Sequence, residues 1–359
     1  MTDVHKVNFD SKMVSTSHGN LDYDYLVLAT GATTNFFGMK DVEKNSYPMK
    51  SLTESLNLRS KILENFEKAL YTQNLEERKR LMSFAIVGAG PTGVELAGAL
   101  AELKWKILPK DYPVLDLRDM QIHLIEGGDR VLSGMSAESS EKSLAFLRGL
   151  GVNVWLNSIV DTYDGKTIMT KGNQCFKTNN LIWSAGVSGD LPEFDRTSIE
   201  KAPGNRIKTN EFCQIEGFEN VYALGDMAYF QSEEVNGYPM MGSVAMQQGK
   251  YLGKTFNKLA KNKKVSAFEY KDKGVMATIG RNKAVAEVAH FKFKGIFAWF
   301  VWMAVHLMLL VGFRNRVLVF INWVWNYIKY NNGNRLIIRK SDEQYTDQNI
   351  DRDDYNLVS

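Results

Sequence analysis

The residues with the clearest chemical meaning are three glycines within residues 84–100, FAIVGAGPTGVELAGAL. Gly88, Gly90 and Gly93 form the pattern G-x-G-x-x-G between a predicted buried parallel strand and a predicted helix. The first glycine permits a tight turn, the second lets a pyrophosphate approach the backbone, and the third lets the helix pack on the strand. The N–H groups and the dipole at the helix N-terminus attract phosphate. The pattern predicts a dinucleotide site, and the alternative is a glycine turn needed only for close packing.

A carboxylate stands at the end of the next predicted strand. Residues 121–125 form this strand and Glu126 follows it. An acid at this place accepts hydrogen bonds from both ribose hydroxyls and repels a 2′-phosphate, so Glu126 favours NADH over NADPH. It lies farther from the glycines than the usual distance of about 20 residues, and a segment containing Pro109 and Pro113 accounts for the difference. The alternative is an ordinary solvated acid.

Three further turns follow predicted buried strands. Ala185 and Gly186 are expected to face the nicotinamide, while an A-T-G turn ends in Gly31 and an L-G-D turn ends in Asp226. The A-T-G turn, the glycine pattern and the L-G-D turn occur in the order found in flavoproteins with a nicotinamide domain inserted into a flavin domain. In that arrangement Asp226 hydrogen-bonds a hydroxyl of the flavin and the Gly31 turn closes over it.

Length and composition narrow the class of protein. A chain of 359 residues allows two or three domains, and a net charge of +3 gives no argument for binding nucleic acid. Cys175 and Cys213 form no C-x-x-C, so disulfide scaffolds, zinc ribbons and dithiol redox chemistry lack their residues, and no metal site is expected. This cysteine usage indicates a reducing compartment. The N-terminus has no apolar region typical of a secretory signal.

The C-terminal part is much more apolar than the rest. Residues 295–313 contain one ionisable side chain, His306, and a second apolar stretch covers 317–328. As a helix, the first stretch would be roughly 28 Å long, close to the bilayer's apolar thickness of about 30 Å. Three interpretations are possible for this part of the chain: a membrane-spanning helix, a buried core helix, or helices that lie in the membrane interface. The interface is favoured because tryptophans and basic residues border the apolar stretches: Trp299, Trp323, Lys292, Lys294, Arg314 and Arg316.

Two more segments narrow the family. A-M-Q-Q-G at 245–249 and I-G-R-N-K-A-V at 279–285 precede the apolar C-terminus with its F-R-N-R at 313–316. Together with GPTGVELAGAL, they closely resemble the type II NADH dehydrogenases, which are single-subunit NADH:quinone oxidoreductases. The resemblance extends to about residue 335, and it excludes ferredoxin and rubredoxin reductases, which lack the membrane-binding C-terminus.

The resemblance implies a monotopic membrane flavoenzyme that does not pump protons. Members of this family are typically homodimers on the cytoplasmic side of the inner (cell) membrane. NADH passes a hydride to FAD, and the reduced flavin passes two electrons to a membrane quinone. The implied cofactors are therefore NADH and FAD, and the implied partners are a quinone, the bilayer surface and a second copy of the chain.

The resemblance also implies residues near the quinone. Glu95, in G-V-E, matches the acid that the family places near the nicotinamide and the quinone, and the alternative is a first-turn acid that suits the helix dipole. Gln247 would line the quinone pocket, with a helix-surface glutamine as the alternative. His306 is either a polar contact on the quinone side or a residue that fills the membrane interface.

A second set implied by the resemblance lies on the flavin side. Lys294 joins Asp226 as a matching flavin contact, although a basic anchor at the membrane edge is its alternative. Val4 is a candidate backbone contact to the adenosine half of FAD. Gly242 and Ser243 replace the Ala-Gln that family members carry, so backbone contacts to the flavin can survive whereas the glutamine amide is lost.

The expected fold class is α/β, a flavoprotein with two dinucleotide-binding domains. A Rossmann-like NAD domain is inserted in an incomplete FAD domain, and C-terminal membrane-interface helices follow. The expected boundaries are 1–80 and 206–290 for the FAD domain, 81–205 for the NADH domain, 291–335 for the membrane-associating helices and 336–359 for a polar tail. Within this plan one amphipathic helix is predicted over 51–80.

One absence leaves the function open. The family begins with a strand–glycine-turn–helix unit that holds the flavin pyrophosphate, and this sequence has only the nicotinamide pattern at 88–93. The chain would then have an internal start or need a complementing N-terminal piece. The alternative hypothesis is a catalytically inactive NADH-binding fragment that associates with membranes and cannot hold FAD.

Overall fold

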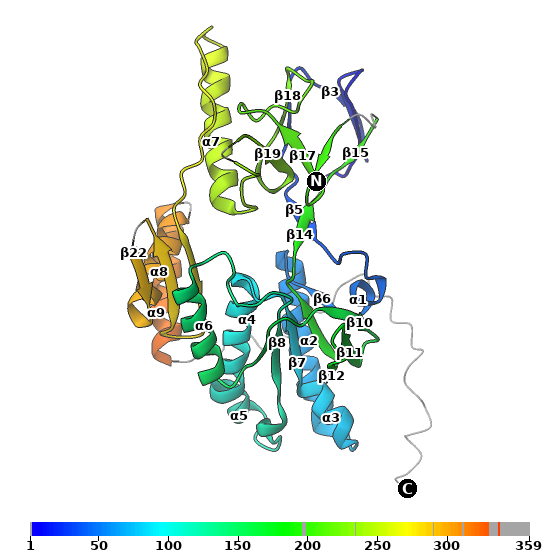
Figure 1. Ribbon diagram of the computed structural model, residues 1–359, viewed down its shortest axis with the longest axis vertical. Helices are drawn as coiled ribbons and strands as arrows, with labels where there is room; N and C mark the ends of the chain where they lie inside the picture. The colour runs from blue at the N-terminus through cyan, green and yellow to red at the C-terminus, as the bar shows by residue number, and fades with distance from the viewer. Residues whose placement is uncertain are drawn as a thin grey trace.

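The computed structural model describes residues 2–195, 199–233, 235–289, 291–310, 312–329 and 337. The expected polar tail, 336–359, therefore lies outside the described residues apart from Ile337. The chain forms two lobes, which stand one above the other in Figure 1. An antiparallel ribbon of β5 (Ala32–Thr34) and β14 (Val187–Gly189) lies between them. A second connection runs from α7 (Gly242–Leu259) in the upper lobe to β20 (Val275–Thr278) in the lower lobe.

A five-stranded parallel sheet forms the centre of the lower lobe. Its order is β6 (Tyr47–Pro48), β13 (Asn180–Trp183), β7 (Phe84–Val87), β8 (Ile122–Ile125) and β9 (Asn153–Trp155). All residues of β7 and β13 are buried, as expected for strands covered on both faces. Along the chain, the strands after β7 are added on one side, whereas β13 pairs with its other side. The strand order therefore reverses at β7, the kind of point where open α/β sheets bind ligands.

Helices cover one face of this sheet and a small antiparallel sheet covers the other. Because strand side chains alternate, Phe84 and Ile86 pack into the helical layer, whereas Ala85 and Val87 pack against the small sheet. The helical layer consists of α2 (Leu52–Tyr71), α3 (Leu75–Met82), α4 (Pro91–Glu102) and α6 (Ala137–Gly149). The small sheet consists of β10 (Val160–Tyr163), β11 (Thr167–Thr170) and β12 (Cys175–Lys177), with α1 (Lys40–Asn45) beside it.

The predicted helix over 51–80 is two helices. α2 begins at a capping box in which Ser51 and Glu54 bind each other's backbone N–H groups. It ends where Thr72 becomes extended, and Asn74 then caps α3 by accepting from two backbone N–H groups. α4 continues into a π-helical turn, Leu103–Ile107, and α5 (Leu108–Asp111). α2 and α3 pack in the core of the nucleotide sheet, although most of their residues lie in 1–80, the predicted first part of the FAD domain. The predicted domain boundaries stay predictions.

The upper lobe combines three small sheets with α7. Leu28 of β4 (Leu26–Leu28) is level with Ala223 of β18 (Val221–Ala223) in a parallel pair. The A-T-G and L-G-D turns therefore start at the same edge. The remaining strands are β1 (Val4–Asn8), β2 (Met13–Thr16), β3 (Gly19–Asp22) and β15 (Glu193–Phe194) in one sheet, and β16 (Lys201–Ala202), β17 (Arg206–Thr209) and β19 (Ala228–Phe230) in another.

The C-terminal part packs on the side of the lower lobe. β20, β21 (Ala284–Val288) and β22 (Phe291–Lys294) form an antiparallel sheet that packs against α8 (Ile296–Leu309), and α9 (Phe313–Lys329) packs against α8 (Figure 1). The apolar run 295–313 is broken, because Leu310 is extended and Gly312 has a φ of +86°. In the described part of the chain, no helix combines the length and the apolar character needed to cross a bilayer.

Candidate functional site

The glycine turn after β7 has the predicted geometry. Gly88 has a φ of +99°, and a Cβ on it would lie 2.6 Å from the Ala185 Cα. A Cβ on Gly93 would lie 1.9 Å from the Gly88 carbonyl oxygen, so only glycine lets α4 approach the turn. Gly90 is the N-cap of α4, and a Cβ on it would meet nothing within 4 Å. The first and third glycines therefore serve packing, and the second faces open space.

Glu126 lies at the end of β8 and contacts the glycine turn directly. Its carboxylate accepts hydrogen bonds from the Ala89 N–H at 2.6 Å and from the Gly128 N–H at 2.8 Å. Glu126 is half-buried. These two bonds hold the carboxylate beside the glycine turn, and its role in binding NADH stays a prediction.

A cleft of about 400 Å³ opens where the strand order reverses. Gly88, Glu126 and Ala185 line it, at the ends of three neighbouring parallel strands. Gly186 lies next to Ala185, and its carbonyl accepts a hydrogen bond from the Asn35 N–H at 3.1 Å. Residues that the sequence predicts to contact different parts of the dinucleotide thus lie at one edge of the sheet.

Residues without a sequence motif complete this cleft. Trp183 is buried, and its indole N–H donates to the Asn35 carbonyl at 2.8 Å, which holds the following loop over the strand end. Phe37 on that loop is 62% exposed and lines the cleft. Asp161 and Lys171 reach it from the strands β10 and β11 and their flanks. In the sequence, an aromatic residue at the end of a strand is only a weak signal for a binding site. Asp161 and Lys171 belong to no motif that could have indicated their place in the cleft.

The predicted flavin residues of the upper lobe also lie close together. The Thr30 hydroxyl, which donates to the Asp190 carbonyl, lies 3.2 Å from Met227 Sδ, so the turn of Gly31 lies beside the turn that carries Asp226. The Asp226 carboxylate forms an ion pair with Lys50 Nζ at 3.0 Å. Lys50 stands just before the capping box of α2, so this ion pair connects the two lobes; no local motif marks it.

The N-terminus of α7 faces the same turn. Gln248, which is buried, accepts a hydrogen bond from the Gly225 N–H at 2.7 Å and fixes the helix beside Asp226. Gly242 is the first residue of α7, and the N-cap Met241 supplies no side-chain hydrogen bond. No N-cap side chain therefore binds the first N–H groups of the helix. Such N–H groups can bind an electron-rich group of a ligand. Ser243 pairs its hydroxyl with that of Tyr270 at 3.1 Å.

Glu95 and His306 lie within electrostatic range of each other, although they are 211 positions apart in the sequence. Glu95 accepts hydrogen bonds from the Thr278 N–H at 3.2 Å and from the Thr278 hydroxyl at 3.4 Å. His306 stacks on Trp302 with 4.0 Å between ring centroids. Burial raises the pKa of the Glu95 carboxyl above its usual range, although the hydrogen bonds from Thr278 and Trp302 and the charge of His306 oppose that rise.

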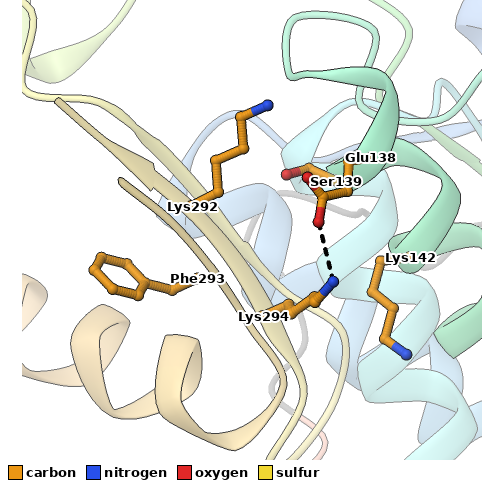
Figure 2. Close-up of a pocket in the computed structure, with 6 residues that line it drawn as sticks. All are labelled: Glu138, Ser139, Lys142, Lys292, Phe293 and Lys294. Carbon is orange, nitrogen blue, oxygen red and sulfur yellow. Dashed lines mark hydrogen bonds and ion pairs between the residues drawn. The ribbon is translucent and has the colours of Figure 1, made fainter. Parts of the chain in front are cut away.

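The other predicted residues lie apart from these clusters. Both polar atoms of the Gln247 amide pair with the Lys271 backbone, at 2.9 and 3.1 Å. Val4 is 48% exposed on β1, where it pairs with Thr16. Lys294 forms an ion pair with Glu138 at 3.0 Å. Figure 2 shows this pair at a small surface cleft between β22 and α6. The roles assigned to these residues stay predictions.

Comparison with known proteins identifies the family. The model of the pyridine nucleotide-disulphide oxidoreductase family matches residues 1–249, and that of the NDH2 C-terminal domain matches residues 273–329. The solved structure of NDH2 from Plasmodium falciparum in complex with NADH superimposes with a TM-score of 0.85 at 23% identity, covering 94% of this chain and 85% of that one. This likeness confirms the expected α/β flavoprotein fold. The membrane association of α8 and α9 stays a prediction.

Curated relatives agree with this assignment. The type II NADH:quinone oxidoreductase of Mycobacterium tuberculosis is 33% identical over 87% of this chain and 68% of its own length. An internal alternative NAD(P)H-ubiquinone oxidoreductase of Arabidopsis thaliana mitochondria is 32% identical over 85% and 63%. The chain thus spans about two thirds of the length of these relatives. The expected enzyme class and the cofactor pair NADH and FAD are confirmed at the level of the family. The chain belongs to the type II NADH:quinone oxidoreductases.

Proposed function

We propose that this chain oxidises NADH and reduces a membrane quinone through FAD without pumping protons. The observation that carries the proposal is the cleft at the strand-order reversal, where Gly88, Glu126 and Ala185 meet. NADH fits it because Gly90 leaves open space at the N-terminus of α4 and the Glu126 carboxylate lies beside the turn. In this site the helix N-terminus binds the pyrophosphate, and Glu126 selects a free 2′-hydroxyl.

FAD is proposed to bind at the joint between the lobes. Asp226 binds a hydroxyl of its ribityl chain or ribose, and Gly31, Gly242 and Ser243 supply backbone contacts around it. The uncapped first turn of α7 and the shared edge of β4 and β18 support this assignment. When bound, FAD supplies the chemistry of accepting a hydride and releasing two electrons to the quinone. Lys294 and Val4 are further proposed contacts to FAD.

The quinone is proposed to reach Glu95 from the side of α8 and α9. His306 and Gln247 are the proposed polar contacts of the quinone. Both helices expose large apolar side chains, including Phe300, Phe313 and Ile321. Helices of this kind lie in the bilayer interface with their apolar side inserted. We therefore propose a monotopic homodimer on the cytoplasmic side of the inner (cell) membrane.

Flavin content and NADH oxidation test the proposal together. The full chain, purified with added FAD, is expected to be yellow and to oxidise NADH when a water-soluble quinone is present. An Asp226→Asn variant keeps the shape of the side chain and is expected to lose most of its flavin. A colourless wild-type chain that still binds NADH would instead establish the alternative, an inactive NADH-binding fragment.

The choice of nucleotide tests the role of Glu126. Glu126→Arg removes the acceptor for the ribose hydroxyls and adds a partner for a 2′-phosphate, so the preference for NADH over NADPH is expected to fall at least about tenfold. Nucleotide binding by titration measures this ratio. Glu219→Arg, an exposed acid of the upper lobe, makes the same change of charge elsewhere and should leave the ratio unaltered. Equal binding of both nucleotides by the wild type would contradict the assignment.

A further inference from the structure

A second cleft, of about 560 Å³, lies where the end of α4, the π-helical turn after it and the end of α6 meet the turn between β20 and β21. Its lining carries three cationic side chains, Lys106, Arg148 and Arg281, and one acid, Glu102. It shares no lining residue with the nucleotide cleft. The volume is in the range of sites for small ligands, and the excess of positive charge indicates that the ligand is an anion.

The acid of this cleft is bound to the backbone of the turn. The Glu102 carboxylate accepts a hydrogen bond from the Arg281 N–H. A Cβ on Gly280 would lie 3.1 Å from the Glu102 Oε1, so the carboxylate packs closely against the same turn. Glu102 therefore holds the turn between β20 and β21 in place, and the cations outnumber it.

Lys106 and Arg148 are the cations that a ligand can reach. Both are exposed, and neither side chain has a hydrogen-bond or ion-pair partner among the residues that the structure describes. Arg148 is not needed to cap α6, because backbone N–H groups donate to the last carbonyls of that helix. The Leu150 carbonyl accepts from the Trp105 indole N–H at 3.1 Å. The positive charge of Lys106 and Arg148 is thus available to an anion.

Arg281 connects the cleft to α9. Its guanidinium lies 3.7 Å from the centre of the Tyr327 ring and donates to the Tyr327 carbonyl. The Tyr327 hydroxyl donates to the Asn282 amide oxygen at 3.2 Å. The last turn of α9 therefore lies at the rim of the cleft, and it carries the exposed apolar side chains of Val324 and Trp325 nearby.

A basic cleft beside an exposed apolar helix favours one class of ligand. An anionic phospholipid joins a phosphate group to apolar chains. Phosphate forms strong, charge-assisted hydrogen bonds with arginine and lysine, and acyl chains require an apolar surface such as that of α9. Trp105 is 51% exposed at the cleft, and tryptophan is enriched at the level of lipid headgroups. A free phosphate ester would use the cations but not the helix.

We propose that this cleft binds the phosphate group of an anionic phospholipid, with Lys106 and Arg148 as its charge partners and the acyl chains along α9. The inference rests on the proposed placement of α9 at the bilayer surface, and it requires neither FAD nor a quinone. Through Arg281 and Tyr327, the occupied cleft fixes the end of α9 at the level of the headgroups.

Titration of the full chain with monomeric short-chain lipids tests the site. Dihexanoylphosphatidylglycerol is expected to bind saturably at one site, and zwitterionic dihexanoylphosphatidylcholine at least about tenfold more weakly. The double variant Lys106→Gln/Arg148→Gln should lower the affinity for the anionic lipid about tenfold or more. Lys106→Arg/Arg148→Lys keeps both charges and should stay within about threefold of the wild type. Wild-type affinity in the glutamine variant would overturn the proposal.

A matched control separates a site from general attraction to anions. Lys292→Gln/Arg314→Gln also replaces one lysine and one arginine, both exposed beside the C-terminal helices but outside the cleft. It should keep the wild-type affinity for the anionic lipid, and an equal loss in both double variants would refute the site. Because Lys106 and Arg148 are exposed, their glutamine variant should unfold within about 2 °C of the wild type.

The source of the phosphate is tested with soluble ligands. Inorganic phosphate and glycerol phosphate lack acyl chains, so each is expected to compete with dihexanoylphosphatidylglycerol at least about tenfold more weakly than the lipid binds. Glycerol phosphate that binds as tightly as the lipid would assign the cleft to free phosphate esters and overturn the lipid assignment.

Vesicle co-sedimentation separates this inference from the proposed function. Vesicles of phosphatidylcholine alone measure the apolar insertion of α9, and vesicles that also contain phosphatidylglycerol measure the added contribution of the cleft. Stronger binding to the second kind, lost in Lys106→Gln/Arg148→Gln, supports the inference whether or not the chain reduces a quinone. A chain that binds both kinds equally would refute the lipid site and leave the membrane placement intact. A chain that binds neither kind would refute the placement, and the lipid site with it.

Discussion

At the scale of single residues, burial gives His123 a chemical state that its sequence position does not reveal. His123 lies on β8, with its ring 5.2 Å from that of Phe176 and 6.2 Å from that of Trp155. The Trp155 indole N–H donates to His123 Nδ1 at 3.2 Å, so the imidazole is held neutral. Burial lowers the pKa of His123 to about 4. The side chain is therefore part of the core rather than a catalytic base.

This shift predicts how stability depends on pH. Because the pKa of His123 is lower in the folded state than the ordinary value of about 6.5, the unfolded state binds more protons at acid pH. The stabilising contribution is present above about pH 6.5 and is lost as the pH falls toward 4, by up to about 3 kcal/mol. His123→Phe should remove this part of the pH dependence, as measured by urea unfolding between pH 7 and 4.

The control for this experiment is a histidine outside the core. His18 is exposed in the turn between β2 and β3, so His18→Phe should keep the wild-type slope of unfolding free energy against pH. Equal slopes for the wild type and His123→Phe would show that His123 is not the group responsible.

At the scale of elements, the sequence predicted the β7–turn–α4 unit because its requirements are local. The positive φ of Gly88 and the close approach of α4 at Gly93 follow from residues that are neighbours in the chain. The break of the apolar run at Gly312 was not predicted. Gly312 adopts a left-handed backbone conformation, but a single glycine between apolar residues does not indicate a break in the sequence. The division of residues 51–80 into α2 and α3 was also missed, although the N-cap residue Asn74 was a visible signal.

Alanine substitutions at two glycines of this unit are expected to affect different properties, stability in one case and NADH affinity in the other. Gly93→Ala places a Cβ 1.9 Å from the Gly88 carbonyl oxygen, so the usual gain of alanine in a helix is outweighed and stability should fall by about 2 kcal/mol or more. Gly90→Ala has a φ of −69° and free space, so stability should stay within about 0.5 kcal/mol. Its new methyl group instead faces the pyrophosphate, and NADH affinity should fall at least about tenfold.

Thermal unfolding and NADH titration of both variants separate packing from binding. The expected pattern is an unstable Gly93→Ala protein and a stable Gly90→Ala protein with weak NADH binding. Wild-type NADH affinity in Gly90→Ala would mean that the pyrophosphate does not approach this residue.

At the scale of the whole molecule, the contacts that join distant segments could not be predicted from the sequence. The ion pair of Lys50 and Asp226 joins residues 176 positions apart and connects the two lobes. The hydrogen bond from Thr278 to Glu95 likewise depends on how β20 packs against α4. Such pairs are set by tertiary packing and leave no period or motif in the chain. The dinucleotide cleft, by contrast, was predictable in outline because strand ends of a parallel sheet meet at one edge.

The outward face of α9 carries exposed apolar side chains. Leu318 is 49% exposed and belongs to an apolar surface with Val317, Phe320 and Ile321. If this surface inserts into a bilayer, Leu318→Asp places a charge at the interface and should lower partitioning onto lipid vesicles about tenfold or more. Leu52→Asp makes the same change at a 78% exposed residue in the first turn of α2, where an acid suits the helix dipole. Vesicle co-sedimentation should leave Leu52→Asp at the wild-type level, and equal binding of both variants would show that α9 does not contact the lipid.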